Sequence, residues 1–288
     1  MELNRVDCIL EAKAMLGEGA LWSAAEQALW FVDIKRDTVH RLNTADGAHD
    51  MWPSPPRPGF IAPRRSGGFV VGTQAGLQDF DPVSGSFTRR TPIEADRPGN
   101  RINDGHVDAH GRLWFGTMDD AEKAPTGALY RLDARGLVRC DDGYAITNGP
   151  AFCPRSSRLF HTDTLGRVIY AFDVDAEGNL ANKRIFAHVD PGNPDGMAVD
   201  AEGCVWSALY GGWGINRYAA TGELLGHLAF PCANVTKLAF GGDDLRTIYA
   251  TTAQWHMTEA ALAEQPLAGG VFRVRVDVPG LPQALFDG

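Results

Sequence analysis

Apolar segments recur along this chain at nearly constant spacing. Six short runs of aliphatic and aromatic residues have their leading aromatic residue at positions 30, 69, 114, 160, 206 and 249. The intervals between these positions are 39, 45, 46, 46 and 43 residues. A period in the forties whose units consist of strands predicts one four-stranded sheet per repeat. We therefore expect an all-β fold, a six-bladed β-propeller with four-stranded antiparallel blades around a central channel.

Two further strand patterns flank each run. The preceding segment, for example 106–108 or 197–199, is expected to be the innermost strand of its blade, next to the axis. The following segment, for example 128–133, shows the period-two pattern of a β-strand, in which successive side chains point to opposite faces of the sheet. Turns such as 82–85 contain the glycine that hairpins require. Because these units use nearly the whole chain, we predict a single propeller domain, residues 1–288.

The two ends of the chain also carry strand patterns. Val6, Cys8 and Leu10 alternate with their neighbours near the N-terminus, and residues 272–278 alternate in the same way near the C-terminus. We expect the N-terminal strand to complete the last blade, which would hide both free strand edges. A helix is expected only near residues 258–264.

Composition and charge narrow the set of partners. The formal net charge is −9 and no stripe of basic residues is present, which argues against nucleic acid and against an anionic membrane surface. No apolar run approaches the roughly 20 residues of a transmembrane helix, and the N-terminus lacks the apolar region of a secretory signal. The five cysteines are odd in number and show no CxxC spacing, as is typical of reduced thiols. We expect a cytoplasmic protein, with a monomer as the default state.

Four of the predicted innermost strands begin with an oxygen-bearing residue followed by glycine. These pairs are Glu18-Gly19, Asp104-Gly105, Asn148-Gly149 and Asp195-Gly196. Each pair alone could be a turn dipeptide. At the same register in a propeller, however, the four side chains would face one another at one mouth of the channel. Two carboxylates and an amide oxygen, from Glu18, Asn148 and Asp195, are hard ligands for a divalent cation, and three protein ligands leave positions open for water and substrate.

Other residues near this mouth suggest how a substrate would be held. Arg101 and Asn103 precede the third innermost strand; Arg101 could be a solvated loop residue, but beside a cation such a pair can hold hydroxyls or a developing oxyanion. His106 is a candidate to contact the ligand residues on the side that faces away from the cation. His161 lies in an apolar strand and is expected to be packed in the core. The chain has no HExxH, GxSxG, GxGxxG or P-loop motif, so zinc-hydrolase, serine-hydrolase and nucleotide-binding functions have no support.

At these positions the chain resembles the family of sugar lactonases that includes gluconolactonase and regucalcin, along essentially its whole length. Bacterial aldonolactonases of pentose catabolism, xylonolactonase among them, show a similar pattern, including residues 266–272. The segments that carry the resemblance are Leu16–Gly19, Arg101–Gly105, Trp114–Met118, Thr147–Gly149, His161–Thr164, Pro194–Met197 and Phe240–Gly242.

The resemblance implies one catalytic divalent cation at the mouth of the channel. Glu18, Asn148 and Asp195 match the metal ligands of the family, Asp195 also matches its proposed general base, and Arg101 and Asn103 match its substrate-binding pair. Members of the family are reported with calcium, zinc, manganese or iron(II), so the resemblance does not fix the metal.

Additional residues are expected to support the site. Some members of the family place a glutamate after the Gly-Thr-Met motif to contact the substrate. In this chain the nearby residues are Asp119, Asp120, Ala121 and Glu122, with Asp119 and Glu122 as the candidates, and that contact is open. Asp104 and His106 are candidates for contacts behind the ligands.

We therefore predict a metal-dependent hydrolase that opens sugar aldono-lactones, pentono- or hexono-lactones, to the aldonic acid. A metal-dependent propeller esterase or phosphotriesterase acting on non-sugar substrates is the first alternative. A non-catalytic binding scaffold is the second, because propellers serve both uses. The sequence leaves open which sugar lactone is the substrate.

Overall fold

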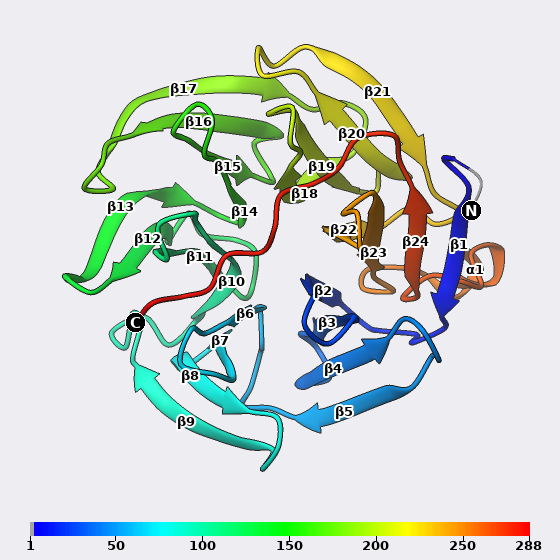
Figure 1. The fold of residues 1–288 in the computed structure, drawn as a ribbon, viewed down its shortest axis with the longest axis horizontal. Coiled ribbons are helices and arrows are strands. Elements are labelled where there is room, and N and C mark those ends of the chain that lie inside the picture. Colours follow the sequence, from blue (N-terminus) through cyan, green and yellow to red (C-terminus); the bar gives the residue numbers. More distant parts are fainter. Residues whose placement is uncertain (1–2) are drawn as a thin grey trace.

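The computed structural model describes residues 3–288 as six four-stranded antiparallel sheets arranged in a ring (Figure 1). This arrangement confirms the prediction of a six-bladed β-propeller. In five of the sheets the strands lie side by side in chain order, and in the sixth the N-terminal strand lies outside three C-terminal ones; the first strand after each connection between blades lines the axis. The apolar runs of the sequence form the second strands, whose side chains are almost all buried.

The strands have the following bounds. Blade one contains β2 (Gly17–Ser23), β3 (Ala28–Asp33), β4 (Thr38–Asn43) and β5 (His49–Pro53), and blade two β6 (Phe60–Pro63), β7 (Phe69–Thr73), β8 (Gly76–Asp81) and β9 (Ser86–Thr91). Blade three contains β10 (Asn100–Val107), β11 (Leu113–Asp119), β12 (Gly127–Asp133) and β13 (Gly136–Tyr144). Blade four contains β14 (Thr147–Cys153), β15 (Arg158–Asp163), β16 (Val168–Val174) and β17 (Leu180–His188). Blade five contains β18 (Asn193–Val199), β19 (Val205–Tyr210), β20 (Gly214–Tyr218) and β21 (Leu224–Ala229). Blade six contains β22 (Val235–Gly241), β23 (Thr247–Thr252), β24 (Val271–Arg275) and the N-terminal strand β1 (Val6–Leu10).

The last blade is completed from the opposite end of the chain. β1 pairs antiparallel with β24, with Val6 opposite Val274 and Cys8 opposite Phe272. The pairing covers the outer edge of β24 and joins the first strand of the chain to the last strand, which closes the ring.

Deletion of residues 1–12 should therefore lower the melting temperature by at least about 5 °C, because it uncovers the edge of β24 and the core beneath it. Differential scanning calorimetry measures this shift. Adding a synthetic peptide of residues 1–12 should restore part of the loss, whereas an unchanged melting temperature would contradict a structural role for β1.

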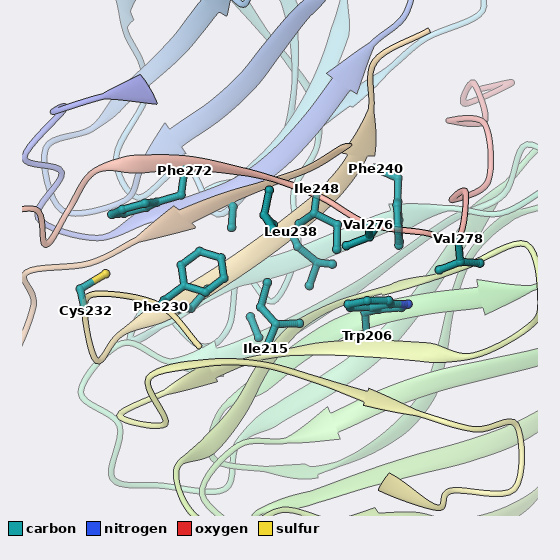
Figure 2. Packing of buried hydrophobic residues seen from close by; sticks show 14 of the residues in the cluster. Trp206, Ile215, Phe230, Cys232, Leu238, Phe240, Ile248, Phe272, Val276 and Val278 are labelled. Carbon is teal, nitrogen blue, oxygen red and sulfur yellow. The ribbon is translucent and has the colours of Figure 1, made fainter. Parts of the chain in front are cut away.

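Aromatic and aliphatic side chains fill the space between neighbouring blades. Figure 2 shows the cluster between blades five and six, where Trp206 and Phe240 meet nearly at right angles with ring centres 5.9 Å apart. Phe230 and Phe272 pack in a similar way at 5.6 Å. Such packing fixes each blade against the next and so fixes the side chains that project from the innermost strands.

Several smaller expectations concern single segments. The one helix among the described residues, α1 (Glu259–Glu264), begins after Thr258, whose side chain accepts the backbone N–H of Ala261. This confirms the helix expected near residues 258–264. His161 is fully buried against the edge of Tyr144, which confirms its place in the core. No helix of residues 3–288 is long and apolar enough to cross a membrane.

The channel contains a largely apolar cavity of about 320 Å³, which we call the axial cavity. Its walls come from the innermost strands of all six blades, with Trp22, Phe60, Phe152 and Phe240 among them. The C-terminal segment crosses one face of the ring, the face turned to the viewer in Figure 1, and its residues 281–284 line the axial cavity. The other end of the axial cavity lies beneath the polar residues described next.

Candidate metal and substrate site

The four oxygen-bearing residues of the sequence pattern all lie at irregularities of the innermost strands. The pairing register shifts beside Glu18 in β2, Asp104 in β10, Asn148 in β14 and Asp195 in β18. A β-bulge redirects the side chain at which it occurs, and bulges are common beside functional sites. Gly19 and the glycine after Asn148 have positive φ angles, +62° and +46°, that residues with side chains rarely adopt. In β2 and β14 the glycine of the residue-glycine pair therefore permits the bend.

Three of these residues line one small pocket at the mouth of the channel. Glu18, Asn148 and Asp195 share this pocket, about 140 Å³ in volume, with Arg101 and Asn103. The structure thus brings together all five residues that the sequence predicted as ligands or substrate contacts. Their roles toward a metal or a substrate stay predictions.

The two ligand candidates with carboxylates are deeply buried. Only 4% of Glu18 and 4% of Asp195 is exposed. Burial, with the charge of Asp104 nearby, raises the pKa of Glu18 to about 8. Burial and the charge of Glu18 also raise the pKa of Asp195 well above its ordinary value. Two adjacent buried carboxylates are unfavourable unless a positive charge compensates them.

Asp195 has an oxygen that the protein leaves without a partner. Among the residues that the structure describes, none forms a hydrogen bond with Asp195 Oδ1, although this atom is buried. Such an atom is costly unless something else binds it. Together with Glu18 and Asn148 it forms a set of hard oxygen donors, so the residues present fit a divalent cation.

Asn148 is held in place from both sides. Its Nδ2 donates to Thr164 Oγ1 at 3.0 Å, and its Oδ1 accepts from Asn103 Nδ2 at 2.9 Å. Asn103 Nδ2 also donates to the carbonyl of Thr147 at 2.7 Å, and Asn103 Oδ1 accepts from Arg101 Nη1 at 2.5 Å. Asn103 therefore joins Asn148 to Arg101, and it positions both whether or not it also contacts substrate.

Arg101 is buried and depends on Asp120, a residue after the Gly-Thr-Met motif to which the sequence assigned no role. Its Nε donates to Asp120 Oδ1 at 2.7 Å. Asp120 also accepts from Lys35 Nζ at 3.1 Å and from Arg57 Nε at 3.2 Å. Asp120 thereby links three loops at the rim of the pocket and fixes the direction of the Arg101 guanidinium.

The structure places the two candidates after the Gly-Thr-Met motif, Asp119 and Glu122, in different surroundings. Asp119 accepts backbone N–H groups of Ala121, Lys123 and Ala124 at 3.0–3.1 Å, so its carboxylate shapes the loop and does not line the pocket. Glu122 does line the pocket. Glu122 is therefore the better placed of the two to contact a substrate.

His106 and Asp104 lie on the other side of the ligand residues. His106 lines the axial cavity and not the pocket. Burial and the charge of Lys237 lower its pKa to about 4, so it is neutral. Asp104 Oδ2 accepts from Lys237 Nζ at 2.6 Å and from Gly149 N at 2.7 Å, directly behind Asn148.

Sequence reasoning missed the wall that faces the polar residues. Met118, Ile146, Leu165, Tyr210 and Trp255 supply this wall. The Tyr210 hydroxyl donates to the carbonyl of Trp255, which ties blade five to the loop after β23. Met118 and Tyr210 lie at the ends of β11 and β19, and Ile146, Leu165 and Trp255 lie in loops, where no repeat pattern marks them.

A second group of metal-type side chains lies away from the pocket. Asp200, Glu202 and Cys204 place one ligand atom each within 4.8 Å of one another. Arg217 already contacts both carboxylates, at 2.8 Å and 2.7 Å, and the indole N–H of Trp206 donates to Asp200 at 2.9 Å. The positive charge that these carboxylates need is thus supplied by the protein, and the group belongs to the turn between β18 and β19.

Fold and pocket together define a β-propeller with a cluster of hard oxygen donors at the mouth of its channel. The family described as "SMP-30/Gluconolactonase/LRE-like region" matches residues 16–254, and the chain belongs to this family.

Proteins similar over their whole length include named lactonases. The chain is 36% identical to 6-deoxy-6-sulfogluconolactonase of Pseudomonas putida, with 98% of each chain covered. It is 35% identical to L-arabinolactonase of Azospirillum brasilense, covering 97% of this chain and 95% of that protein. The crystal structure of a calcium-binding protein, regucalcin, from Agrobacterium tumefaciens superimposes with a TM-score of 0.94 at 26% identity, covering 98% of this chain and 97% of the other.

Proposed function

We propose that this protein is a metal-dependent lactonase that hydrolyses sugar aldono-lactones to the corresponding aldonic acids. The observation that carries this proposal is the buried pair of Glu18 and Asp195, with its unpartnered oxygen, beside the fixed guanidinium of Arg101 in one small pocket. Similarity to two named lactonases supports the same reaction.

Glu18, Asn148 and Asp195 would hold the cation, with calcium, zinc, manganese and iron(II) as the candidates. When bound, a divalent cation supplies Lewis-acid polarisation of a carbonyl and lowers the pKa of water. In the reaction, water adds to the lactone carbonyl carbon, the bond from that carbon to the ring oxygen breaks, and the products are a carboxylate and a hydroxyl group. Asp195 is the base that takes the proton from the attacking water, because its Oδ1 has no partner within the described protein.

Arg101 and Asn103 would orient the substrate. Asp120 and Asn103 hold Arg101, so the guanidinium can donate to sugar hydroxyls or to the oxyanion that develops on the carbonyl oxygen without first being ordered. The apolar wall with Tyr210 and Trp255 would pack against the C–H face of the sugar ring and exclude water.

The substrate class proposed is a small aldono-lactone. The two named lactonases act, by their names, on a substituted hexonolactone and on a pentonolactone, so ring size is open for this chain. Loops 57–61, 119–127 and 210–216 should set the preference. Glu122 and Tyr210, from two of these loops, line the pocket.

An esterase or phosphotriesterase activity on non-sugar substrates is the second candidate. The apolar wall of Met118, Ile146 and Leu165 favours it, since such side chains can also accept an aryl or alkyl group. Relative rates with aldono-lactones and aryl esters distinguish the two candidates.

The deciding experiment follows proton release from pentono- and hexono-lactones, using chelated protein with and without added Ca²⁺, Zn²⁺, Mn²⁺ or Fe²⁺. We expect turnover to vanish on chelation and to return with at least one cation. Faster reaction with aryl esters than with any lactone would favour the second candidate. Folded protein that accelerates neither class would favour a non-catalytic binding scaffold.

A further inference from the structure

Asp104 holds the same register position as the three ligand candidates but does not share their pocket. Glu18, Asn148 and Asp195 line the pocket, whereas Asp104 is 1% exposed and lies below it. Its Oδ1 accepts from Gly105 N at 2.7 Å. Its Oδ2 accepts from Gly149 N and from Lys237 Nζ. The protein thus engages both oxygens of the fourth oxygen-bearing residue.

Lys237 reaches this position from blade six, one of the two blades that lack such a residue-glycine pair. Blade six begins its innermost strand with Asn234-Val235, and the register of β22 shifts between Val235 and Lys237. The ammonium group meets Asp104 Oδ2 at 2.6 Å, and both side chains are almost completely buried. Lys237 also lines the axial cavity, so it approaches Asp104 from beneath the pocket.

Two glycines of the repeat make this arrangement possible. A Cβ at Gly196 would lie 2.2 Å from Lys237 Cδ and 2.8 Å from the carbonyl oxygen of Thr236. The residue after Asp195 must therefore be glycine for the lysine to pass. A Cβ at Gly149 would lie 2.8 Å from Met197 N, so the N–H that Asp104 accepts also depends on a glycine.

The charges around the pocket then match a dication. Glu18, Asp104 and Asp195 are three buried carboxylates, and Lys237 is the cation that contacts one of them. Arg101 is paired with Asp120.

We propose that Lys237 and Asp104 are a positioning pair that keeps Asp104 from becoming a fourth protein ligand of the cation. The pair rests on the proposed cation site of Glu18, Asn148 and Asp195. By binding Asp104 from below, Lys237 preserves a site with three protein ligands and open positions, as a catalytic site requires. Asp104 in turn fixes the Gly149 peptide and so the neighbouring ligand Asn148.

The test is a charge cycle with Lys237→Met, Asp104→Asn and the double variant. Affinity for Mn²⁺ and Ca²⁺ is measured on metal-stripped protein by competition with a fluorescent chelator, and kcat and KM are measured separately at saturating cation. Lys237→Met should bind the cation about tenfold more tightly and lose about tenfold in kcat, because Asp104 becomes free to occupy an open position. Asp104→Asn should bind about tenfold more weakly, because the ammonium group of Lys237 is then uncompensated.

The double variant removes both charges and should return to within about threefold of the wild-type affinity. Shifts of the same sign in both single variants, or an unchanged kcat for Lys237→Met at saturating cation, would overturn the proposal, because the loss of a nearby positive charge alone tightens cation binding but does not fill an open position. If Lys237→Met does not fold, the difference between Asp104→Asn and the double variant decides the question. Wild-type protein that binds neither cation would instead refute the cation site of the proposed function.

Discussion

Replacing Asp195 by asparagine should lower kcat by at least about two orders of magnitude at saturating divalent cation, the size of effect that a general base contributes. Asparagine keeps the shape of the side chain and one oxygen donor, but it cannot accept a proton at neutral pH. The buried Oδ1 of Asp195 has no partner in the described protein, so the amide group at this position loses no hydrogen bond. Initial rates of proton release with the best lactone measure the change.

Asp96→Asn is a matched control, because the Asp96 side chain is 83% exposed and lies in a loop away from the pocket. It should turn over like the wild-type protein. The cation content of Asp195→Asn must be determined alongside the rates, so that lost chemistry is separated from lost metal. Turnover close to wild type with cation bound would show that another group acts as the base.

The regular parts of the fold were accessible from the sequence because they depend on local patterns. Strands such as β11 and β19 appear as short apolar runs, and their spacing fixes the number of blades. The residue-glycine pairs likewise coincide with register shifts in four innermost strands, and two of their glycines, Gly19 and Gly149, have positive φ angles. These two patterns were sufficient to find Glu18, Asn148 and Asp195.

The contacts that organise the site were not accessible, because they join residues far apart in the chain. Asp104 and Lys237 are 133 positions apart, and Lys35 and Asp120 are 85 apart. Neither Asp120 nor Lys237 has a local pattern that separates it from ordinary loop or strand residues. Such pairs become visible only when the blades are placed around the axis.

The depth of a side chain along the channel was equally hard to infer. Arg101 and Asn103, two positions apart, both line the pocket, whereas His106, which lies near the predicted mouth in sequence, lines the axial cavity. Alternation along a strand separates its two faces, but it does not say which part of the channel each side chain reaches.

Replacing Glu18 by glutamine should weaken cation affinity by at least about tenfold, because the site loses one of its two ligand carboxylates. In the metal-free protein the same change removes a buried carboxyl group whose pKa is raised by burial and by the charge of Asp104, and which in turn raises the pKa of Asp195. We therefore expect the chelated variant to melt at the same temperature as chelated wild-type protein or higher. Added cation should raise its melting temperature less than that of the wild type, since stabilisation by a ligand follows its affinity.

The opposite directions of these two effects distinguish a ligand from a structural carboxylate. Replacing a structural glutamate would lower the melting temperature of the chelated protein. Replacing a metal ligand would lower only the rise in melting temperature that the added cation causes. Glu26→Gln is the matched control, because Glu26 is a surface residue paired with Arg41. It should leave both temperatures unchanged. Elemental analysis after dialysis gives an independent measure, and Glu18→Gln that retains cation as fully as wild type would contradict the assignment of Glu18 as a ligand.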